Sequence, residues 1–384
     1  MTSEAPDSLF ANLDLLVLQA TPFCNLDCSY CYLPNRDDKR RMSMETLRDT
    51  LRMVASGGLA TETLSIVWHA GEPLVVGRDY YREAFAVVAE CVPAGTRIRH
   101  QFQTNAVLLD DAWCEFIAEH EISIGVSIDG PAHIHDARRK TRNGKGTHAA
   151  VMRGIDALKR HGIPFHTIGV ISRESLPHAD AIYDFFSSLG ATQVGFNVEE
   201  IEAGHTSSSL EQVRTAEFKR FFARIVERWQ VAPSPLRIRE IQRVLDALVS
   251  PEFGSVLGSD QSNAGRILSV SSDGEFTTWS PELLGSVHPT HGSLSLGSVA
   301  RGLDAPARRK LAVIQDEIDR GRRACRDACK FFSFCLGGAP ANKLGEHATF
   351  AATETMFCRL TEKVVVSTVL ESLDASLVTL TPAA

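Results

Sequence analysis

Residues 21–32 read TPFCNLDCSYCY, which spaces Cys24, Cys28 and Cys31 as C-x3-C-x2-C directly after an apolar stretch at 15–19. Three thiolates on one tight loop can hold three irons of a cubane cluster, whereas a full thiolate set has four. The missing ligand leaves one iron open for a substrate or cofactor. A zinc site favours paired C-x2-C knuckles with a fourth Cys or His nearby, so zinc and chance thiols are the weaker alternatives.

Apolar stretches rich in Val and Ile alternate with amphipathic stretches over the first 200 residues. This alternation predicts an α/β fold with parallel strands and right-handed crossovers, six units of which form a partial (β/α)6, TIM-like barrel. The predicted strands are 15–19, 64–69, 98–104, 122–128, 166–171 and 193–197, and the predicted helices are 44–55, 78–90, 110–119, 148–161 and 178–189.

Four motifs follow the first four predicted strands. They are the cysteine triad, Ala-Gly-Glu-Pro at 70–73, Thr-Asn at 104–105 and Asp-Gly-Pro at 129–131. Chemistry in such a barrel sits at the carboxyl ends of the strands. We therefore expect one site on this rim.

The strand–helix alternation stops near residue 205. Two helices are expected at 210–230 and 236–249, then a hairpin of strands 266–270 and 275–279, a cysteine-rich segment at 325–358 and a last helix from about 354. These patterns divide the chain into a barrel domain at 1–205, a helical bridge at 206–258, and a cysteine module with the C-terminal helix at 259–384.

Composition excludes several classes of protein. The chain has 384 residues, 44% of them hydrophobic, and a formal net charge of −7, whereas a general nucleic-acid binder is usually basic. No apolar run reaches the length of a membrane span, and the first residues lack the layout of a secretory signal, so we expect a cytoplasmic protein without nucleic-acid or membrane partners. Of the nine cysteines, Cys91 and Cys114 stand alone and are expected in the core.

The triad, with an aromatic residue before its third cysteine, resembles the radical S-adenosylmethionine (SAM) superfamily. The resemblance implies a [4Fe–4S] cluster on the triad, whose open iron binds SAM and whose electron cleaves SAM to a 5′-deoxyadenosyl radical. The motif at 70–73 matches the family's Gly-Gly-Glu-Pro, with Ala70 in place of the first glycine. The SAM contacts that the resemblance implies are Tyr30, Gly71, Glu72, Gln103, Asn105, Ser127 and Arg139.

The cysteines at 325, 329, 335 and 358 resemble the SPASM domain of peptide-modifying radical SAM enzymes, which usually carries seven cysteines and two auxiliary clusters. The three cysteines of the first auxiliary cluster align with Ser262, Trp279 and Ala339, so that cluster is lost. All four ligands of the second are kept. The resemblance implies one auxiliary [4Fe–4S] cluster on Cys325, Cys329, Cys335 and Cys358, with a structural zinc site as the alternative.

Among SPASM enzymes the chain is most similar to maturases that form three-residue cyclophanes, as the stretches 31–36 and 354–358 suggest. The implied partners are a ribosomally made precursor peptide and an external one-electron donor resembling flavodoxin or ferredoxin. The implied product carries a C–C bond between an aromatic ring and a side-chain β-carbon. Sulfatase maturases use an Asp base where this chain has Ser280, which argues against that reaction.

Other functions stay open. Thioether formation, epimerisation and hydroxyl oxidation use the same cofactors, and a non-catalytic zinc-binding interaction protein is a third class. The sequence names no general base. The acids and histidine nearest the module are Glu282, Glu346, His347 and Glu354.

Overall fold

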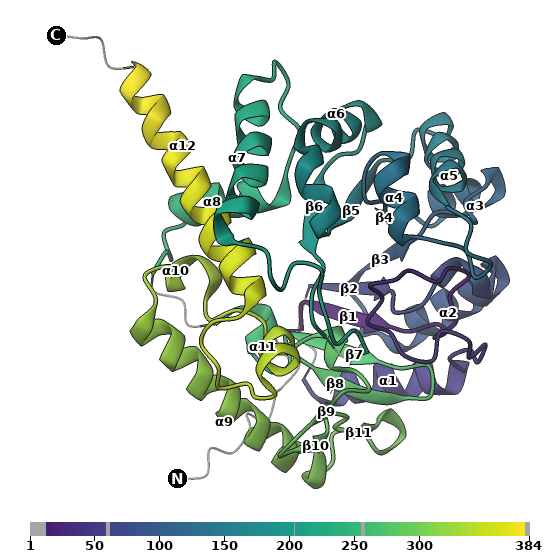
Figure 1. Ribbon diagram of the computed structural model, residues 1–384. Coiled ribbons are helices and arrows are strands. Elements are labelled where there is room, and N and C mark those ends of the chain that lie inside the picture. The colour runs from purple at the N-terminus through teal and green to yellow at the C-terminus, as the bar shows by residue number, and fades with distance from the viewer. Residues whose placement is uncertain (1–12, 59–61, 203, 255–257, 381–384) are drawn as a thin grey trace.

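The structure, a computed structural model, describes residues 13–58, 62–202, 204–254 and 258–380, with side chains to residue 374. The expectations for the first twelve and last four residues lie outside this part. A curved sheet forms the centre of the molecule (Figure 1). Its strands are β1 (Leu15–Leu18), β2 (Thr63–Trp68), β3 (Arg97–Thr104), β4 (Ser123–Ser127), β5 (Phe165–Ile171), β6 (Val194–Val198), β7 (Ile267–Val270), β8 (Glu275–Thr278) and β11 (Gly297–Ser298). Outside it, β9 (Val287–His288) pairs with β10 (Gly292–Ser293).

Strands β1 to β6 are parallel and neighbour one another in chain order. The α/β class and the partial barrel of six units are thereby confirmed, and each strand lies within two residues of its predicted bounds. Strand β6 is one edge of the sheet, whose order runs β11-β8-β7-β1-β2-β3-β4-β5-β6. Strands β1 and β6 are not paired, so the barrel stays open.

Amphipathic helices connect the parallel strands and bury their apolar faces against the sheet. Figure 1 shows α2 to α6 around the outside of the barrel. They are α1 (Met44–Ser56), α2 (Arg78–Cys91), α3 (Asp111–Glu119), α4 (Ala132–Arg138), α5 (His148–Arg160) and α6 (Ala179–Leu189). Cys114 is fully buried in α3, and Cys91 ends α2 packed against the core, as expected.

The predicted hairpin forms, but its position was not predicted. Strand β7 pairs in parallel with β1, from Leu15 opposite Ile267 to Leu18 opposite Val270. Strand β8 pairs antiparallel with β7 through the turn that contains Gly274. The C-terminal half of the chain therefore extends the barrel sheet beyond its first strand.

Helices make up most of the chain after β6. The bridge consists of α7 (Thr215–Val231) and α8 (Arg239–Val249). Helix α9 (Ala305–Ala328) was not predicted; Asp304 caps it, and residues 307, 311, 314, 318, 321 and 325 form its buried stripe. After α10 (Phe332–Cys335) and α11 (Pro340–His347), a π-helical segment at Cys358–Val364 leads into α12 (Val365–Leu380), which packs on α7 and α8.

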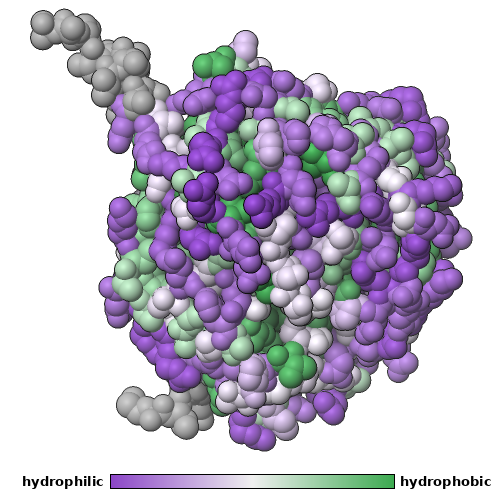
Figure 2. Space-filling view, viewed as in Figure 1, coloured by the Kyte–Doolittle hydropathy of each residue, from purple (hydrophilic) through white to green (hydrophobic). Residues whose placement is uncertain are grey.

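The surface agrees with the composition. Figure 2 shows a mainly hydrophilic face, with hydrophobic residues visible between the polar ones. Within the described residues, every helix is too short or too polar to cross a bilayer.

Candidate active site

The cysteine triad lies on the loop that follows β1, and a second segment holds this loop in place. The amide nitrogens of Asp27 and Ser29 donate to the carbonyl oxygens of Lys140 and Arg138, at 2.8 and 3.1 Å. The three cysteines are half-buried and free of disulfides. The loop between α4 and α5 therefore fixes the loop that carries the thiols.

Burial shifts the pKa of two of these thiols, Cys24 and Cys28. It raises the pKa of Cys24 to about 12, with a further contribution from the negative charge of Glu72. Burial also raises the pKa of Cys28 to about 11, against the opposing positive charge of Arg139. Such thiols stay protonated until a metal displaces the proton, which is how cysteine metal sites load. The donor set fits an iron–sulfur cluster with three protein ligands.

The turn after β2 packs directly against the triad loop. The amide nitrogen of Glu72 donates to the carbonyl oxygen of Phe23 at 2.9 Å. A Cβ atom on Gly71 would lie 2.1 Å from the carbonyl oxygen of Thr21, and its φ of 129° suits glycine alone. Gly71 is therefore required for the two loops to meet. Ala70 has a φ of 66°, a left-handed conformation.

The carboxylate of Glu72 is buried and accepts three hydrogen bonds from the protein. It accepts hydrogen bonds from the Thr104 hydroxyl at 2.6 Å, the Asn105 amide nitrogen at 2.8 Å and the Leu74 amide nitrogen at 3.1 Å. Burial raises its pKa to about 7, against these hydrogen bonds. Glu72 thus ties the end of β2 to the end of β3.

Three further predicted residues lie on the same rim. Nδ2 of Asn105 lies 3.8 Å from Sγ of Cys24 and donates to Oδ1 of Asn25 at 2.8 Å. Nε2 of Gln103, on β3, donates to Oγ of Ser127 on β4 at 3.0 Å. Adjacent parallel strands place these polar groups beside the triad, as the strand-end rule predicts.

Arg139 is buried rather than a surface charge, and Asp129 is its partner. Its Nε donates to Oδ1 of Asp129 at 3.0 Å, and Asp129 also accepts from the Tyr30 hydroxyl at 2.5 Å. The guanidinium lies 5.4 Å from the centre of the Tyr30 ring. Within the described residues the two Nη atoms of Arg139 have no hydrogen-bond partner, which suits them to a bound carboxylate. Sequence analysis missed Asp129 as a site residue.

The four C-terminal cysteines come together in the fold. All of them line one cavity, together with Lys343 and Thr353. They come from the last turn of α9, its C-cap, α10 and the start of the π-helical segment. Burial raises the pKa of Cys335 to about 11 and of Cys358 to about 12. This donor set fits a metal centre with four protein ligands.

Comparisons with known proteins place the chain in a family. A model of the radical SAM superfamily matches residues 18–186. The serine-type anaerobic sulfatase-maturating enzyme of Klebsiella aerogenes is 30% identical over 332 residues, which cover 85% of this chain and 80% of that enzyme. The chain belongs to the radical SAM superfamily. It is an enzyme that uses SAM and a [4Fe–4S] cluster, and it is related to maturases that act on peptides.

Other relatives of this radical SAM enzyme span nearly the whole chain. An uncharacterised protein of Synechocystis is 34% identical over 378 residues, 96% of this chain and 94% of that protein. The solved structure of native anSMEcpe with bound AdoMet superposes with a TM-score of 0.75 at 19% identity, over 94% of this chain and 98% of that one. Streptococcus suis SuiB bound to precursor peptide SuiA gives 0.60 at 16% identity, over 91% and 76%. At these identities the two structures show the fold.

In this radical SAM enzyme, buried side chains occupy two of the three positions where the SPASM resemblance places ligands of the first auxiliary cluster, Ser262 and Trp279. Trp279 is fully buried, and its Nε1 donates to Oε1 of Gln315 at 2.7 Å. Nε2 of Gln315 in turn donates to the carbonyl oxygen of Ser262 at 3.0 Å. Ala339 caps the start of α11. The Gln315 amide thus links the Trp279 indole to Ser262, two of the three positions.

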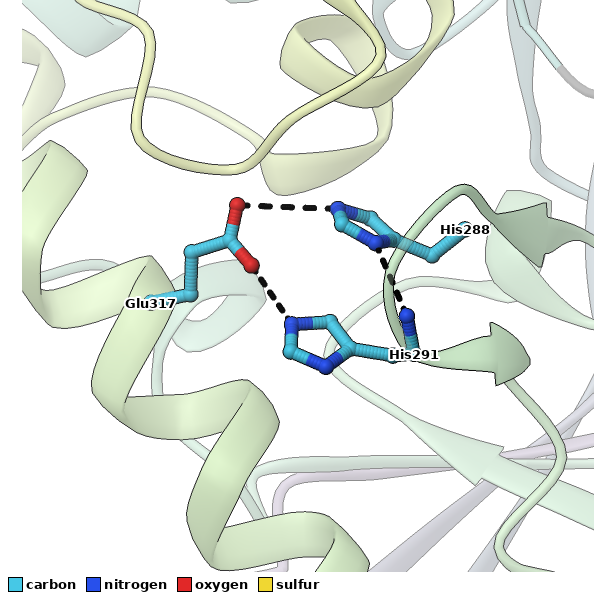
Figure 3. Close-up of side chains that lie close together, drawn as sticks. All are labelled: His288, His291 and Glu317. Atoms are coloured by element: carbon cyan, nitrogen blue, oxygen red, sulfur yellow. Dashed lines mark hydrogen bonds and ion pairs between the residues drawn. The ribbon is translucent and has the colours of Figure 1, made fainter.

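A separate cluster joins His288 and His291 to Glu317 on α9 (Figure 3). Nε2 of His291 lies 2.5 Å from Oε2 of Glu317, and Nε2 of His288 lies 3.5 Å from Oε1. Nδ1 of His288 accepts the amide N–H groups of Thr290 and His291, at 3.1 and 3.3 Å. This ring therefore carries its proton on Nε2, where a metal would need the lone pair. We interpret the cluster as a hydrogen-bonded contact that holds the β9–β10 turn against α9.

Half-buried carboxylates lie near Tyr32 of the triad loop. Glu200 and Glu202 follow β6 and share a hydrogen bond, while Nδ2 of Asn342 on α11 donates to both. Burial raises the pKa of Glu282, which follows β8, to about 7. The buried hydroxyl of Tyr32, next to Cys31, has no hydrogen-bond partner among the described residues. Burial raises its pKa, and so do the charges of Glu282 and Glu202.

Proposed function

We propose that this radical SAM enzyme modifies a ribosomally made precursor peptide and forms a C–C bond between an aromatic ring and the β-carbon of a residue two places later. The observation that carries the proposal is the convergence of four cysteines on one cavity, while Trp279 fills a position of the first auxiliary cluster. Cys24, Cys28 and Cys31 hold the cluster that cleaves SAM. Cys325, Cys329, Cys335 and Cys358 hold one auxiliary [4Fe–4S] cluster.

The SAM site is proposed on the rim of β1 to β4. Gly71 lets the turn after β2 approach the triad, and Arg139 offers its Nη atoms to the SAM carboxylate. Glu72, whose oxygens are already bonded to Thr104 and Asn105, positions the rim. Gln103, Asn105 and Ser127 supply polar groups for the carboxylate and ribose, and Tyr30 packs beside Arg139.

Thiol spacing supports iron–sulfur clusters over zinc. No three of the described cysteine sulfurs lie within 4.8 Å of one another. In a tetrahedral zinc site, with each sulfur about 2.3 Å from the metal, the sulfurs lie about 3.8 Å apart. The described sulfurs are therefore not gathered as closely as they are around one zinc ion. All nine cysteines are free, as in the reducing cytoplasm where we place the enzyme with its flavodoxin- or ferredoxin-like donor.

When bound, SAM and the triad cluster supply a 5′-deoxyadenosyl radical that removes a hydrogen atom from the substrate β-carbon. Addition of that carbon to the ring forms the new bond, after which one electron and one proton must leave to restore aromaticity. The peptide therefore loses two hydrogens in total.

Glu282 is the residue that we propose takes the proton. Ser280 donates a hydrogen bond to its carboxylate, and the carboxylate lies near Tyr32 and Glu200. The other acids are engaged elsewhere. Glu346 accepts the Phe357 amide N–H at 3.2 Å, and Glu354 pairs with Lys363. A carboxylate with a pKa near 7 suits a base that works at neutral pH.

Mass spectrometry tests this function. The anaerobically reconstituted enzyme is incubated with SAM, dithionite and synthetic 20-residue peptides that contain one Trp-Xaa-Asn, Trp-Xaa-Arg or Trp-Xaa-Lys triplet. We expect 5′-deoxyadenosine and a peptide that is about 2 Da lighter, whose fragments keep the triplet intact. The E282Q variant should still form deoxyadenosine but at least tenfold less product, and E354Q, on an exposed ion pair, is the matched control. A full product yield from E282Q would reject Glu282 as the group that takes the proton.

Oxidation of a substrate hydroxyl is the second candidate function, because the Klebsiella relative is a serine-type sulfatase-maturating enzyme. It also removes two hydrogens, so mass alone does not separate the two reactions. A peptide that carries an aldehyde reacts with hydrazine probes, and its backbone fragments normally in the mass spectrometer. A cross-linked peptide does not react with the probes, and its cross-linked triplet stays intact.

A further inference from the structure

Lys343, on α11, is a buried cation beside the four-cysteine cavity. The residue is 5% exposed, and its Nζ lies 3.6 Å from Sγ of Cys325. Within the described part of the chain, no carboxylate lies within 4.0 Å of this nitrogen. A buried ammonium group is costly unless it faces negative charge. The cavity that Lys343 lines is therefore suited to a negative guest.

Of the residues that line this cavity, Glu362 is the other charged one. Glu362 lines the cavity and pairs with Arg243 at 2.6 Å, and Lys363 pairs with Glu354. Lys330, next to Cys329, is exposed to solvent. Because water screens an exposed charge far more than a buried one, Lys343 acts on the cavity more strongly than Lys330 does.

Two contacts fix the position of Lys343. The neighbouring Asn342 donates to the carboxylates of Glu200 and Glu202. A Cβ atom on Gly345 would lie 1.9 Å from the carbonyl oxygen of Ile201, so α11 packs directly on the chain after β6. Figure 1 shows this segment running down beside α11. The lysine is therefore held at the cavity by a short, packed helix.

We propose that Lys343 sets the reduction potential of the auxiliary centre and makes it an electron acceptor. This inference rests on the auxiliary cluster of the proposed function. Four thiolates give an iron–sulfur centre a net negative charge, and each electron taken up adds one more. A fixed positive charge 3.6 Å from one sulfur stabilises the reduced form more than the oxidised form. The potential rises, and the electron that leaves the substrate has a favourable destination.

A redox titration of the full-length C24A/C28A/C31A variant tests the inference, because only the C-terminal centre remains. Electron paramagnetic resonance follows its reduction against mediators, without SAM or peptide. K343M should lower the ratio of reduced to oxidised centre at a fixed potential about tenfold, which corresponds to about 59 mV for one electron. K343R keeps the charge and should keep the wild-type ratio. K330M removes an exposed charge beside Cys329 and should also leave the ratio unchanged.

Three results would overturn the inference. They are an unchanged ratio of reduced to oxidised centre in K343M, the same decrease of that ratio in K343R as in K343M, and zinc in place of iron at this site. If K343M fails to load iron, K343R decides: wild-type iron content and ratio support the role of the charge, and loss of both rejects it. If the triple variant does not fold, the holoenzyme is titrated with and without SAM, which perturbs only the N-terminal signal. Failure of the proposed function appears separately, as wild-type enzyme that yields deoxyadenosine but no lighter peptide.

Discussion

Nε of Arg139 donates to Oδ1 of Asp129 at 3.0 Å, and both side chains are buried. The pair joins the segment after β4 to the residue after α4, and both residues contact Tyr30 of the triad loop. A buried charge that loses its partner is costly, whereas an exposed pair contributes little. This difference gives a prediction about stability and SAM binding together.

We expect D129N to lower the free energy of unfolding by about 3 kcal/mol and to weaken SAM binding, because Arg139 would keep its charge without a partner. Denaturant unfolding and equilibrium dialysis with SAM measure the two effects. The control D111N breaks the exposed pair with Arg160 and should leave the free energy of unfolding nearly unchanged. Equal effects of the two substitutions would contradict the account of the pair.

The two cysteine sets should separate in function. C28A removes a ligand of the SAM-cleaving cluster, so deoxyadenosine should disappear. C329A should keep deoxyadenosine formation and lose peptide product. Metal analysis should give about eight irons for the native enzyme and about four for either variant. C91A, outside both sets, should keep all of the iron; full product formation by C329A would remove the auxiliary centre from the reaction.

The turn after β2 offers a matched pair of substitutions. G71A places a Cβ atom 2.1 Å from the backbone of the triad loop, so we expect loss of iron and of SAM cleavage. A70G relieves a left-handed alanine but adds backbone freedom to the unfolded chain, and should change stability by less than about 1 kcal/mol. Iron content and thermal unfolding check both. A fully active G71A would show that the two loops need not touch.

His135 gives a prediction about pH. It is fully buried, its Nδ1 faces the amide nitrogen of Asp129 at 3.4 Å, and Nε2 contacts the Thr147 hydroxyl at 2.9 Å. Burial lowers its pKa from 6.5 to about 4. The folded protein therefore binds fewer protons than the unfolded chain between these values, and stability falls as the pH falls from 6.5 to 4.

The expected loss from His135 is about 3 kcal/mol across this range. Urea unfolding at several pH values measures it, and H135Q, which does not titrate, should lack this part of the slope. Parallel slopes for the two proteins would mean that His135 is charged or exposed in the fold.

The sequence predicted the barrel well because its signals are local. Alternating strands such as β5, and strand-end motifs such as residues 70–73, are visible in a few residues each. The rim was predictable because carboxyl ends of parallel strands meet. The pairing of β7 with β1 was not, since it joins residues about 250 positions apart and leaves no local trace.

Other features were missed for physical reasons. The buried stripe of α9 includes Ala307, Gly321 and Cys325, so its apolar period is weak among many charges. Asp129 read as part of a turn, and only the fold shows that it neutralises Arg139. Lys343 gave no signal at all, because a lone lysine in a sequence is nearly always a solvated surface group.

The triad loop follows strand β1, which pairs with β2 on one side and with β7 on the other. Truncation of the chain after β6 would remove β7. One edge of β1 would then expose unpaired amide and carbonyl groups next to the iron-binding loop. Such an edge invites association with other chains. The N-terminal and C-terminal halves of the chain therefore contribute strands to one continuous sheet, and we expect that the N-terminal half does not fold as an independent catalyst.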